Sequence, residues 1–179
     1  MNVIIMSKEK VVVLMGSPRD LAFASKIKAF LEKEKFPVDC VYTVASAHRT
    51  PEKLLKDLKE YEKCTVPIVY VTVAGLSDAL SGVVAGTTIH PVIACPPDSD
   101  QHAGAKVFSS TAMPTGVPVA YVVKPENAAL VAVRIFALAN PDLKKCLEKY
   151  SKKQAKAVYD GDEEVKKVTQ KKHINRLAV

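Results

Sequence analysis

Short apolar runs of strand type alternate with helix-like segments over most of the chain. The clearest run, Val11 to Met15, is continuously apolar, rich in β-branched residues and closed by Gly16. That pattern is typical of a strand buried on both faces of a parallel sheet. Ser17-Pro18-Arg19-Asp20 follows at once and has the form of a helix start, with a serine cap, a proline in the first turn and an acidic residue three positions after the cap.

The same cycle recurs along the chain. Further strands are predicted at Val38 to Val44, Ile68 to Val73, Val92 to Cys95 and Val117 to Val123. Helices are predicted after the first strand, from Pro51 with Thr50 as its cap, after Asp78, from about Glu126 to Leu138, and from Leu143 to about Val158. Strands that alternate with helices predict an α/β fold, here a doubly wound parallel sheet in three α/β/α layers of the flavodoxin-like or Rossmann-like kind.

The length of 179 residues suits one such domain. We predict a single domain over residues 1–159 that includes the C-terminal helix. Residues 160–179 are rich in Lys, Glu and Asp with few large apolar side chains, which predicts a charged, flexible tail.

The composition argues against a membrane protein and against a nucleic-acid-binding protein. No apolar run approaches the roughly 20 residues of a membrane helix, and the start of the chain lacks a signal-peptide core, so we expect a cytoplasmic protein with no membrane partner. The net charge of +7 suits an anionic ligand, but the lysines are spread over helix-like segments and aromatic residues make up only 6%, so no nucleic-acid partner is expected. The four cysteines form no C-x-x-C pair and are expected to be reduced thiols.

The loop after the second predicted strand carries the strongest functional signal. His48 and Arg49 stand side by side there, and the carboxyl ends of the strands form the ligand crevice of an open parallel sheet. Imidazole moves protons near neutral pH, and a guanidinium holds phosphate through a fixed fork of donors. Without a ligand, His48 would be a polar loop residue, Arg49 a salt-bridge partner, and Ser46 the closing residue of a turn.

Two further loops are candidates for the same crevice. The turn that begins at Gly16 offers backbone N–H groups at a helix start, which suits an anion, whereas Asp20 suits ribose hydroxyls better than phosphate. Gly75 would let a ligand approach the backbone after the third strand, with Ser77 beside it. The alternatives without a ligand are a capping box formed by Ser17 and Asp20, and a tight turn in which Ser77 caps the next helix.

Neither a metal nor a common nucleotide cofactor is indicated. The other histidines, His90, His102 and His173, match no metal-binding spacing. The chain has no P-loop and no G-x-G-x-x-G, so neither ATP nor NAD is indicated.

Six motifs, in this order, resemble those of the 5-aminoimidazole ribonucleotide (AIR) carboxylases and carboxyaminoimidazole ribonucleotide mutases of purine biosynthesis. They are MGSPRD, SAHRTP, AGLSDALSG, ACPPDSD, MPTGVP and ENAALVAVRIFAL. The mutase branch has a second histidine in an AGGAAHLPG-like third loop, where this chain has Ala79. The third loop and Cys95-Pro96-Pro97 look instead like the branch that uses carbon dioxide directly. That branch usually reads AGRSNALSG, from which this chain departs at Leu76 and Asp78.

The resemblance implies reversible carboxylation of AIR at ring carbon 4 by carbon dioxide, giving 4-carboxy-AIR (CAIR), without ATP, biotin or metal. It makes His48 the carrier of the carbon-4 proton. The substrate-binding residues that it implies are Ser17, Asp20 and Arg49 at the ribose phosphate, and Ser46, Gly75 and Ser77 at the base. It also implies a homo-octamer. The alternatives are the mutase, a carboxylase of another nucleotide and, from a different class, a non-catalytic nucleotide-binding α/β module.

Overall fold

Five parallel strands form one sheet in the order β2-β1-β3-β4-β5. The structure, a computed structural model, describes residues 9–97 and 103–177. The strands are β1 Lys10–Met15, β2 Asp39–Val44, β3 Ile68–Val73, β4 Val92–Ala94 and β5 Ala120–Tyr121. This order and the parallel pairing confirm the predicted doubly wound α/β fold.

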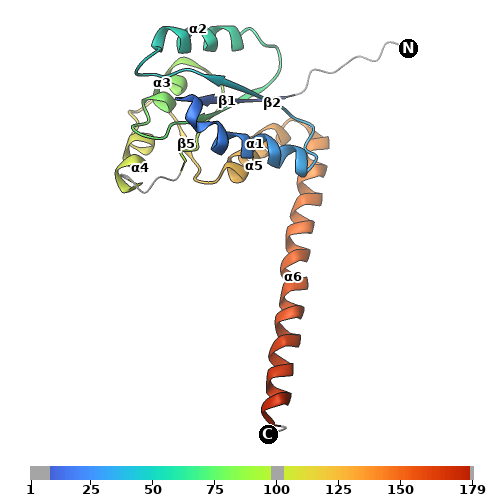
Figure 1. Cartoon of the computed structure of the whole chain (residues 1–179). Coiled ribbons are helices and arrows are strands. Elements are labelled where there is room, and N and C mark those ends of the chain that lie inside the picture. The colour runs from blue at the N-terminus through green and yellow to red at the C-terminus, as the bar shows by residue number, and fades with distance from the viewer. Residues whose placement is uncertain (1–8, 98–102, 178–179) are drawn as a thin grey trace, which may run out of the picture.

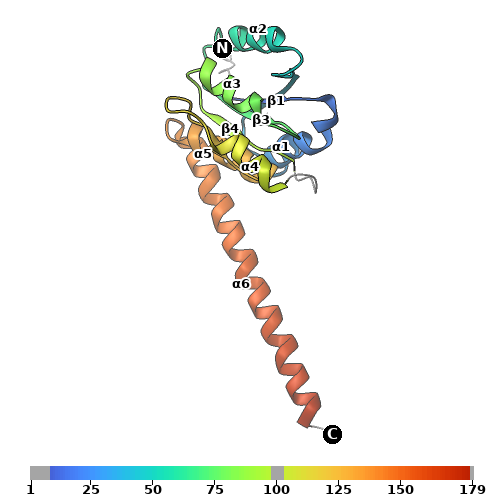
Figure 2. The ribbon, with the colours of Figure 1, turned by 90° about the vertical axis from the view of Figure 1, so that its left-hand side faces the viewer.

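Helices cover both faces of the sheet, which gives the three predicted layers (Figure 1 and Figure 2). One face carries α2 (Pro51–Tyr61) and α3 (Ala79–Thr87), whose buried side chains pack on Val12, Leu14 and Tyr70. The other face carries α1 (Leu21–Lys33) and α5 (Pro125–Ala137), which pack on the alternate residues of the same strands. Since β1 from Val11 on and β3 are buried on both faces, these stretches are continuously apolar apart from Thr72.

The strand register places the carboxyl ends of β1, β2 and β3 side by side. Met15 lies opposite Val44 on one side and Val73 on the other. The chain runs from β1 outward to β2 and then crosses back over β1 to β3, so the strand order reverses between β1 and β3. In doubly wound sheets the ligand crevice opens at this reversal, outside the carboxyl ends of the strands.

Two elements in the second half of the chain differ from the prediction. Helix α4 (Ala103–Thr111) was not predicted, because its run of small residues carries no strong apolar stripe. The last strand was predicted over seven residues but contains only Ala120 and Tyr121. Pro118 has no N–H to give to a ladder, so it limits the strand on that side.

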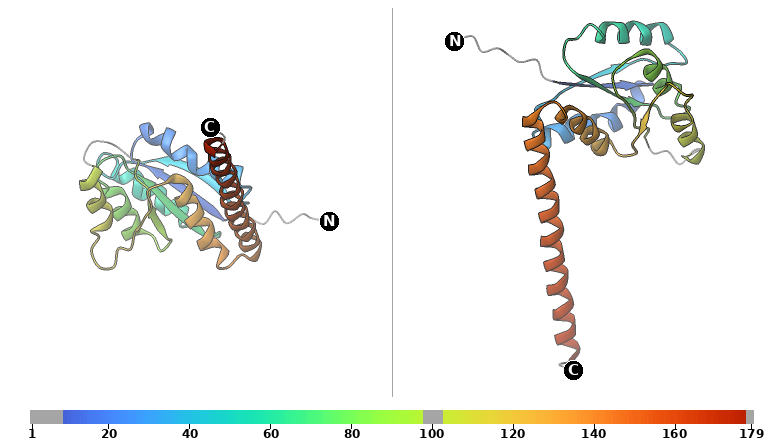
Figure 3. Two further views of the ribbon diagram at one scale, coloured as in Figure 1. Left: turned by 90° about the horizontal axis from the view of Figure 1, so that it is seen from below. Right: turned by 180° about the vertical axis from the view of Figure 1, so that it is seen from behind.

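Helix α6 extends from Pro141 to Leu177, so the predicted helix end near Val158 is wrong. Leu143 is buried in the core and Cys146, Leu147 and Tyr150 pack against it, whereas the helix beyond these residues projects from the domain (Figure 1 and Figure 3). Ion pairs one turn apart, such as Lys156 with Asp160 and Lys166 with Asp162, support the helix where apolar packing ends. The domain limit at residue 159 and the flexibility of the tail stay predictions. Among the described helices, none combines the length and apolar character needed to span a membrane.

Candidate functional site

The first loop of the crevice forms the capping box that the sequence predicts. The Ser17 N–H donates to Asp20 Oδ2 at 3.1 Å, and the Arg19 N–H donates to Ser17 Oγ at 3.3 Å. Pro18–Asp20 is a single 3-10 turn that leads into α1. Both Ser17 and Asp20 are half-buried, so the turn fixes their direction and leaves part of each side chain open to the crevice.

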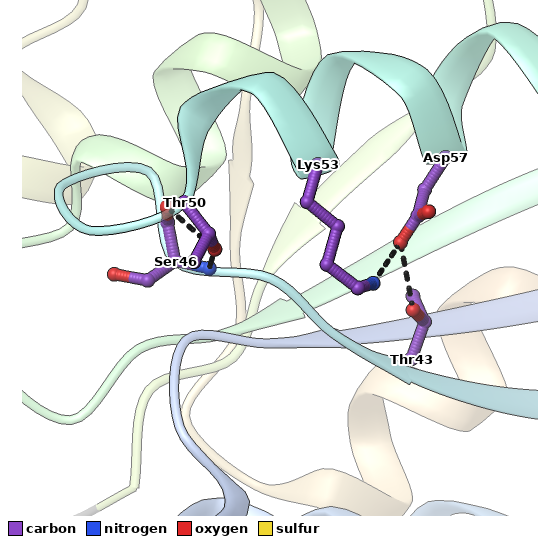
Figure 4. Close-up of polar contacts among 5 residues, drawn as sticks. All are labelled: Thr43, Ser46, Thr50, Lys53 and Asp57. Atoms are coloured by element: carbon purple, nitrogen blue, oxygen red, sulfur yellow. Dashed lines mark hydrogen bonds and ion pairs between the residues drawn. The ribbon is translucent and has the colours of Figure 1, made fainter.

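The second loop is closed on itself by Ser46 and Thr50 (Figure 4). The Ser46 N–H donates to Thr50 Oγ1 at 2.9 Å, and the Thr50 N–H donates to the Ser46 carbonyl at 2.8 Å. The Thr50 hydroxyl is therefore occupied within the loop and makes no capping bond to α2, which corrects the predicted cap, while Pro51 opens the helix as predicted. Farther along, Asp57 of α2 accepts a hydrogen bond from Thr43 of β2, which fixes this helix against the strand.

Arg49 joins the second loop to the first. Its Nη2 donates to the Gly16 carbonyl at 3.3 Å, and its own N–H donates to Ser46 Oγ at 3.2 Å. The guanidinium is exposed and keeps further donors for a ligand. His48 is also exposed, and within residues 9–97 and 103–177 no hydrogen bond or ion pair holds its ring. The imidazole is therefore open to a bound substrate.

The third loop reaches the first at Gly75. A Cβ at this position would lie 3.3 Å from Asp20 Oδ1 and 3.7 Å from Pro97 Cγ, so any larger residue would press on the Asp20 carboxylate. The close approach of Asp20 explains the glycine, whereas the approach of a ligand, which the sequence suggested, stays a prediction. Ser77 is exposed and does not cap α3, because Asp78 is the cap residue and its Oδ1 accepts from the Ser81 N–H at 3.0 Å.

Asp78, one of the two departures from the third motif, is the centre of a buried polar cluster. It is only 3% exposed, and its Oδ2 accepts from the Ser110 hydroxyl at 2.6 Å and from the Ser81 hydroxyl. Its own N–H donates to Ser109 Oγ at 3.0 Å. Asp78 therefore ties α3 and α4 together beneath the third loop. The other departure, Leu76, is 66% exposed beside it.

Burial raises the pKa of Asp20 above its usual value, since the charged carboxylate loses water in the crevice. The hydrogen bond from the Ser17 N–H and the positive charge of Lys106 act in the opposite direction. Asp20 of the first loop thus lies within reach of the charge of Lys106 on α4.

Lys106 is the polar residue of this region that the sequence did not reveal. It is only 7% exposed, and its Nζ donates to the Pro97 carbonyl at 3.4 Å. Its position depends on α4, which was not predicted. The available signal was that Lys106 stands alone as a charged residue in the run of small and apolar residues from Ala103 to Phe108.

Other features of the described chain lie away from the three loops of the crevice. His90 precedes β4 at the amino edge of the sheet, with its Nε2 3.8 Å from a carboxylate oxygen of Glu62. A cavity of about 310 Å³ lies between the end of α1 and the start of β2, away from the three loops. Across residues 9–97 and 103–177, no three His, Cys, Asp or Glu side chains gather as a metal site requires. His102 falls outside the described residues.

Five of the seven predicted site residues are thus connected. Their loops meet around Gly16 and Gly75, and the five are Ser17, Asp20, Ser46, Arg49 and Gly75. His48 and Ser77 are exposed on the second and third of these loops. The arrangement offers a fixed cation, a partly buried carboxylate and a free imidazole at one crevice.

Comparison with known proteins places this crevice in a family. The model of the AIR carboxylase family matches residues 10–157. A phosphoribosylaminoimidazole carboxylase of Archaeoglobus fulgidus is 45% identical over 157 residues, which cover 88% of this chain and 85% of that protein. An N5-carboxyaminoimidazole ribonucleotide mutase of Methanocaldococcus jannaschii is 41% identical over 158 residues, which cover 87% of this chain and 97% of that protein.

A solved structure agrees with the sequence relatives. The crystal structure of Treponema denticola PurE superimposes with a TM-score of 0.84 at 39% identity, covering 88% of this chain and 98% of that one. The matched residues include the whole sheet and all three loops of the crevice. The chain therefore belongs to the AIR carboxylase family.

Proposed function

We propose that this chain is a phosphoribosylaminoimidazole carboxylase that carboxylates AIR reversibly at ring carbon 4, with carbon dioxide as co-substrate. The observation that carries the proposal is the hydrogen bond from Arg49 to the Gly16 carbonyl, which holds the His48 loop over the capping turn of the first loop. Family membership and the 45% identical carboxylase support it.

The chemistry asks little of the protein beyond position and one proton. The aminoimidazole ring is electron-rich at carbon 4, so this carbon attacks carbon dioxide and a carbon–carbon bond forms. The carbon-4 proton must then leave to restore the aromatic ring. His48, unbound and exposed on its loop, is the base that takes this proton and returns it in the reverse reaction. The balanced reaction is AIR plus carbon dioxide giving CAIR plus a proton.

Different residues bind the phosphate, the ribose and the base of the nucleotide. Arg49 and Ser17 hold the phosphate, and Asp20 accepts hydrogen bonds from the ribose hydroxyls. Ser46, Gly75 and Ser77 line the base end. Because Arg49 is already fixed by the Gly16 carbonyl, the chain loses little side-chain freedom when the phosphate binds. Orientation of this kind supplies up to about 7 kcal/mol of the barrier lowering in well-ordered sites.

The proposal requires no ATP, biotin or metal, and it includes a cytoplasmic location and a homo-octamer, as the resemblance implies. Its support for the absence of ATP is the chemistry itself, since the ring carbon is nucleophilic enough to attack carbon dioxide without activation of the carboxyl group.

The second candidate is the mutase, which moves a carboxylate from the exocyclic nitrogen of the nucleotide to carbon 4. The 41% identical mutase of Methanocaldococcus jannaschii supports this candidate. Against it stands Ala79, the first residue of α3, which occupies the place of the second histidine in the mutase motif.

A substrate-choice assay separates the two functions. Purified protein receives AIR with bicarbonate in one reaction and the N5-carboxylated nucleotide in another, both without ATP. We expect CAIR from AIR and bicarbonate at a rate that rises with dissolved carbon dioxide. Conversion of the N5-carboxylated nucleotide with AIR inert would establish the mutase instead, and binding without turnover of either would indicate the non-catalytic module.

A further inference from the structure

The buried lysine of α4 is not used by the proposed function. Lys106 is 93% buried, taking its 7% exposure, and an ammonium group has three N–H donors and no acceptor. Within the part of the chain that the structure describes, its Nζ makes one hydrogen bond, to the Pro97 carbonyl at the long distance of 3.4 Å. Because a buried charge is costly unless it is paired, such a group calls for an anionic partner.

The side chain is held in place by its own helix. Lys106, Ser109 and Ser110 lie three and four residues apart, and therefore on one face of α4. Ser109 and Ser110 are bonded to Asp78 of the third loop. The same face of the helix thus presents Lys106 toward the loops that follow β3 and β4.

Asp20 is a charged neighbour of the lysine, and the two side chains pair incompletely. The positive charge of Lys106 acts on the Asp20 carboxylate. No hydrogen bond joins the two side chains within the described residues; Asp20 Oδ2 accepts from the Ser17 N–H, and Oδ1 faces Gly75. Among residues 9–97 and 103–177, donors of the ammonium group are therefore left for a ligand in the crevice.

Two cations are then anchored on different loops at the carboxyl ends of the strands. Arg49 is bonded to the Gly16 carbonyl, just after β1, and Lys106 to the Pro97 carbonyl, just after β4. Gly75, just after β3, lies between the two anchors, since a Cβ there would be 3.3 Å from Asp20 Oδ1 on one side and 3.7 Å from Pro97 Cγ on the other. The carboxylated nucleotide has two anionic groups at its opposite ends, the phosphate on the ribose and the new carboxylate on ring carbon 4.

We propose that Lys106 binds the carboxylate on carbon 4, while Arg49 holds the phosphate. This assignment rests on the proposed function. It makes Lys106 a specificity residue that favours CAIR over AIR, since AIR carries the phosphate but lacks the carboxylate. The ammonium also stabilises the charge that develops on carbon dioxide as the carbon–carbon bond forms.

The test compares two nucleotides that differ in one charge. Titration calorimetry measures the binding of AIR and of CAIR to protein with His48→Asn, which removes the proposed proton carrier so that CAIR persists. Lys106→Met is then added in the same background. We expect the affinity for CAIR to fall by on the order of tenfold to a hundredfold and that for AIR to change less than about threefold. The 4-carboxamide analogue, which has the shape of CAIR without its charge, should behave like AIR.

Two further variants control for misfolding and for the general loss of a positive charge. Lys106→Gln keeps a polar head for the Pro97 carbonyl and should show the same selective loss, which covers the case that the methionine variant fails to fold. Lys152→Met removes an exposed lysine of α6 and should change neither affinity.

Equal losses for AIR and CAIR would overturn the proposal, because Lys106 would then act on the phosphate or only through Asp20. Unchanged affinities would overturn it as well. If the parent protein bound neither nucleotide, the proposed function itself would fail, a result distinct from either of these.

Discussion

At the scale of single residues, the crevice contains groups that the fold holds in place and one that it leaves free. Ser17, Asp20, Ser46 and Arg49 are each bonded to a neighbouring loop residue before any ligand arrives. The ring of His48 has no such bond among the described residues. Fixed groups suit recognition of the nucleotide, and an unbound imidazole suits a proton carrier that must accept and release.

The raised pKa of Asp20 makes stability depend on pH in a defined direction. Because burial disfavours the ionised form, the folded protein takes up a proton at higher pH than the unfolded chain does. The stability contributed by Asp20 therefore increases as the pH falls from neutral through this raised pKa. We expect Asp20→Asn, which keeps an oxygen acceptor for the Ser17 N–H, to be more stable than the parent at pH 7, with the difference vanishing in acid.

Urea unfolding between neutral and acidic pH measures this difference. Asp39→Asn changes an exposed carboxylate of β2 and serves as the control, with no comparable trend expected. A gain that grew as the pH fell would contradict the assigned sign.

At the scale of helices and strands, the third loop depends on the hydrogen-bond network between α3 and α4. Asp78 accepts three hydrogen bonds there, from the Ser81 N–H and from the hydroxyls of Ser81 and Ser110. The Ser81 hydroxyl in turn contacts that of Thr72 on β3, at 2.6 Å. The network fixes both helices to the central sheet.

Removal of this carboxylate should loosen both helices together. Asp78→Ala leaves buried donors without an acceptor, and we expect a loss of about 3 kcal/mol in the free energy of unfolding. Asp78→Asn keeps one acceptor oxygen and should lose less. Chemical denaturation measures both, with Asp142→Ala at the exposed start of α6 as the control. Equal stabilities of the alanine variant and the parent would show that the network is not structurally required.

The sequence predicts the buried strands better than the helices and loops that connect them, and particular elements show the physical reason. Val11 to Met15 and Ile68 to Val73 are buried on both faces, so their composition alone reveals them. Helix α4 depends on its contact with Asp78, a residue 25 or more positions earlier, which no local pattern encodes.

The same reasoning applies to the candidate site. The strand ends indicate that His48, Arg49 and Asp20 share one edge, because parallel strands bring their carboxyl ends together. The bond from Arg49 to the Gly16 carbonyl and the approach of Gly75 to Asp20 depend on tertiary geometry. Thr50 was predicted to cap α2, but its hydroxyl accepts from the Ser46 N–H instead.

At the scale of the whole molecule, the domain and the long helix α6 are distinct. The family model ends at residue 157, whereas α6 continues to Leu177. Leu143 is buried and Cys146, Leu147 and Tyr150 pack against the core, but the described side chains from Ser151 to Thr169 are exposed apart from Gly161. The distal helix contributes few contacts to the fold.

Shortening this helix should therefore leave the domain intact. A chain that ends after Tyr159 should unfold within about 0.5 kcal/mol of the parent and keep its carboxylation rate, because the described side chains that are lost, Asp160 to Thr169, are exposed apart from Gly161. Thermal unfolding and the AIR assay test this expectation, and light scattering on both proteins tests the proposed octamer. A smaller assembly or a large loss of stability in the shortened chain would show that residues 160–179 belong to the folded core of the assembly.

The central claim is that His48 carries the carbon-4 proton, and the initial rate of AIR carboxylation by its variant tests it most directly. His48→Asn should lower this rate by about a hundredfold or more while the protein stays folded and still binds AIR. His90→Asn, which changes a histidine at the opposite edge of the sheet, should stay near the parent rate. Equal rates for the parent and His48→Asn would contradict the account.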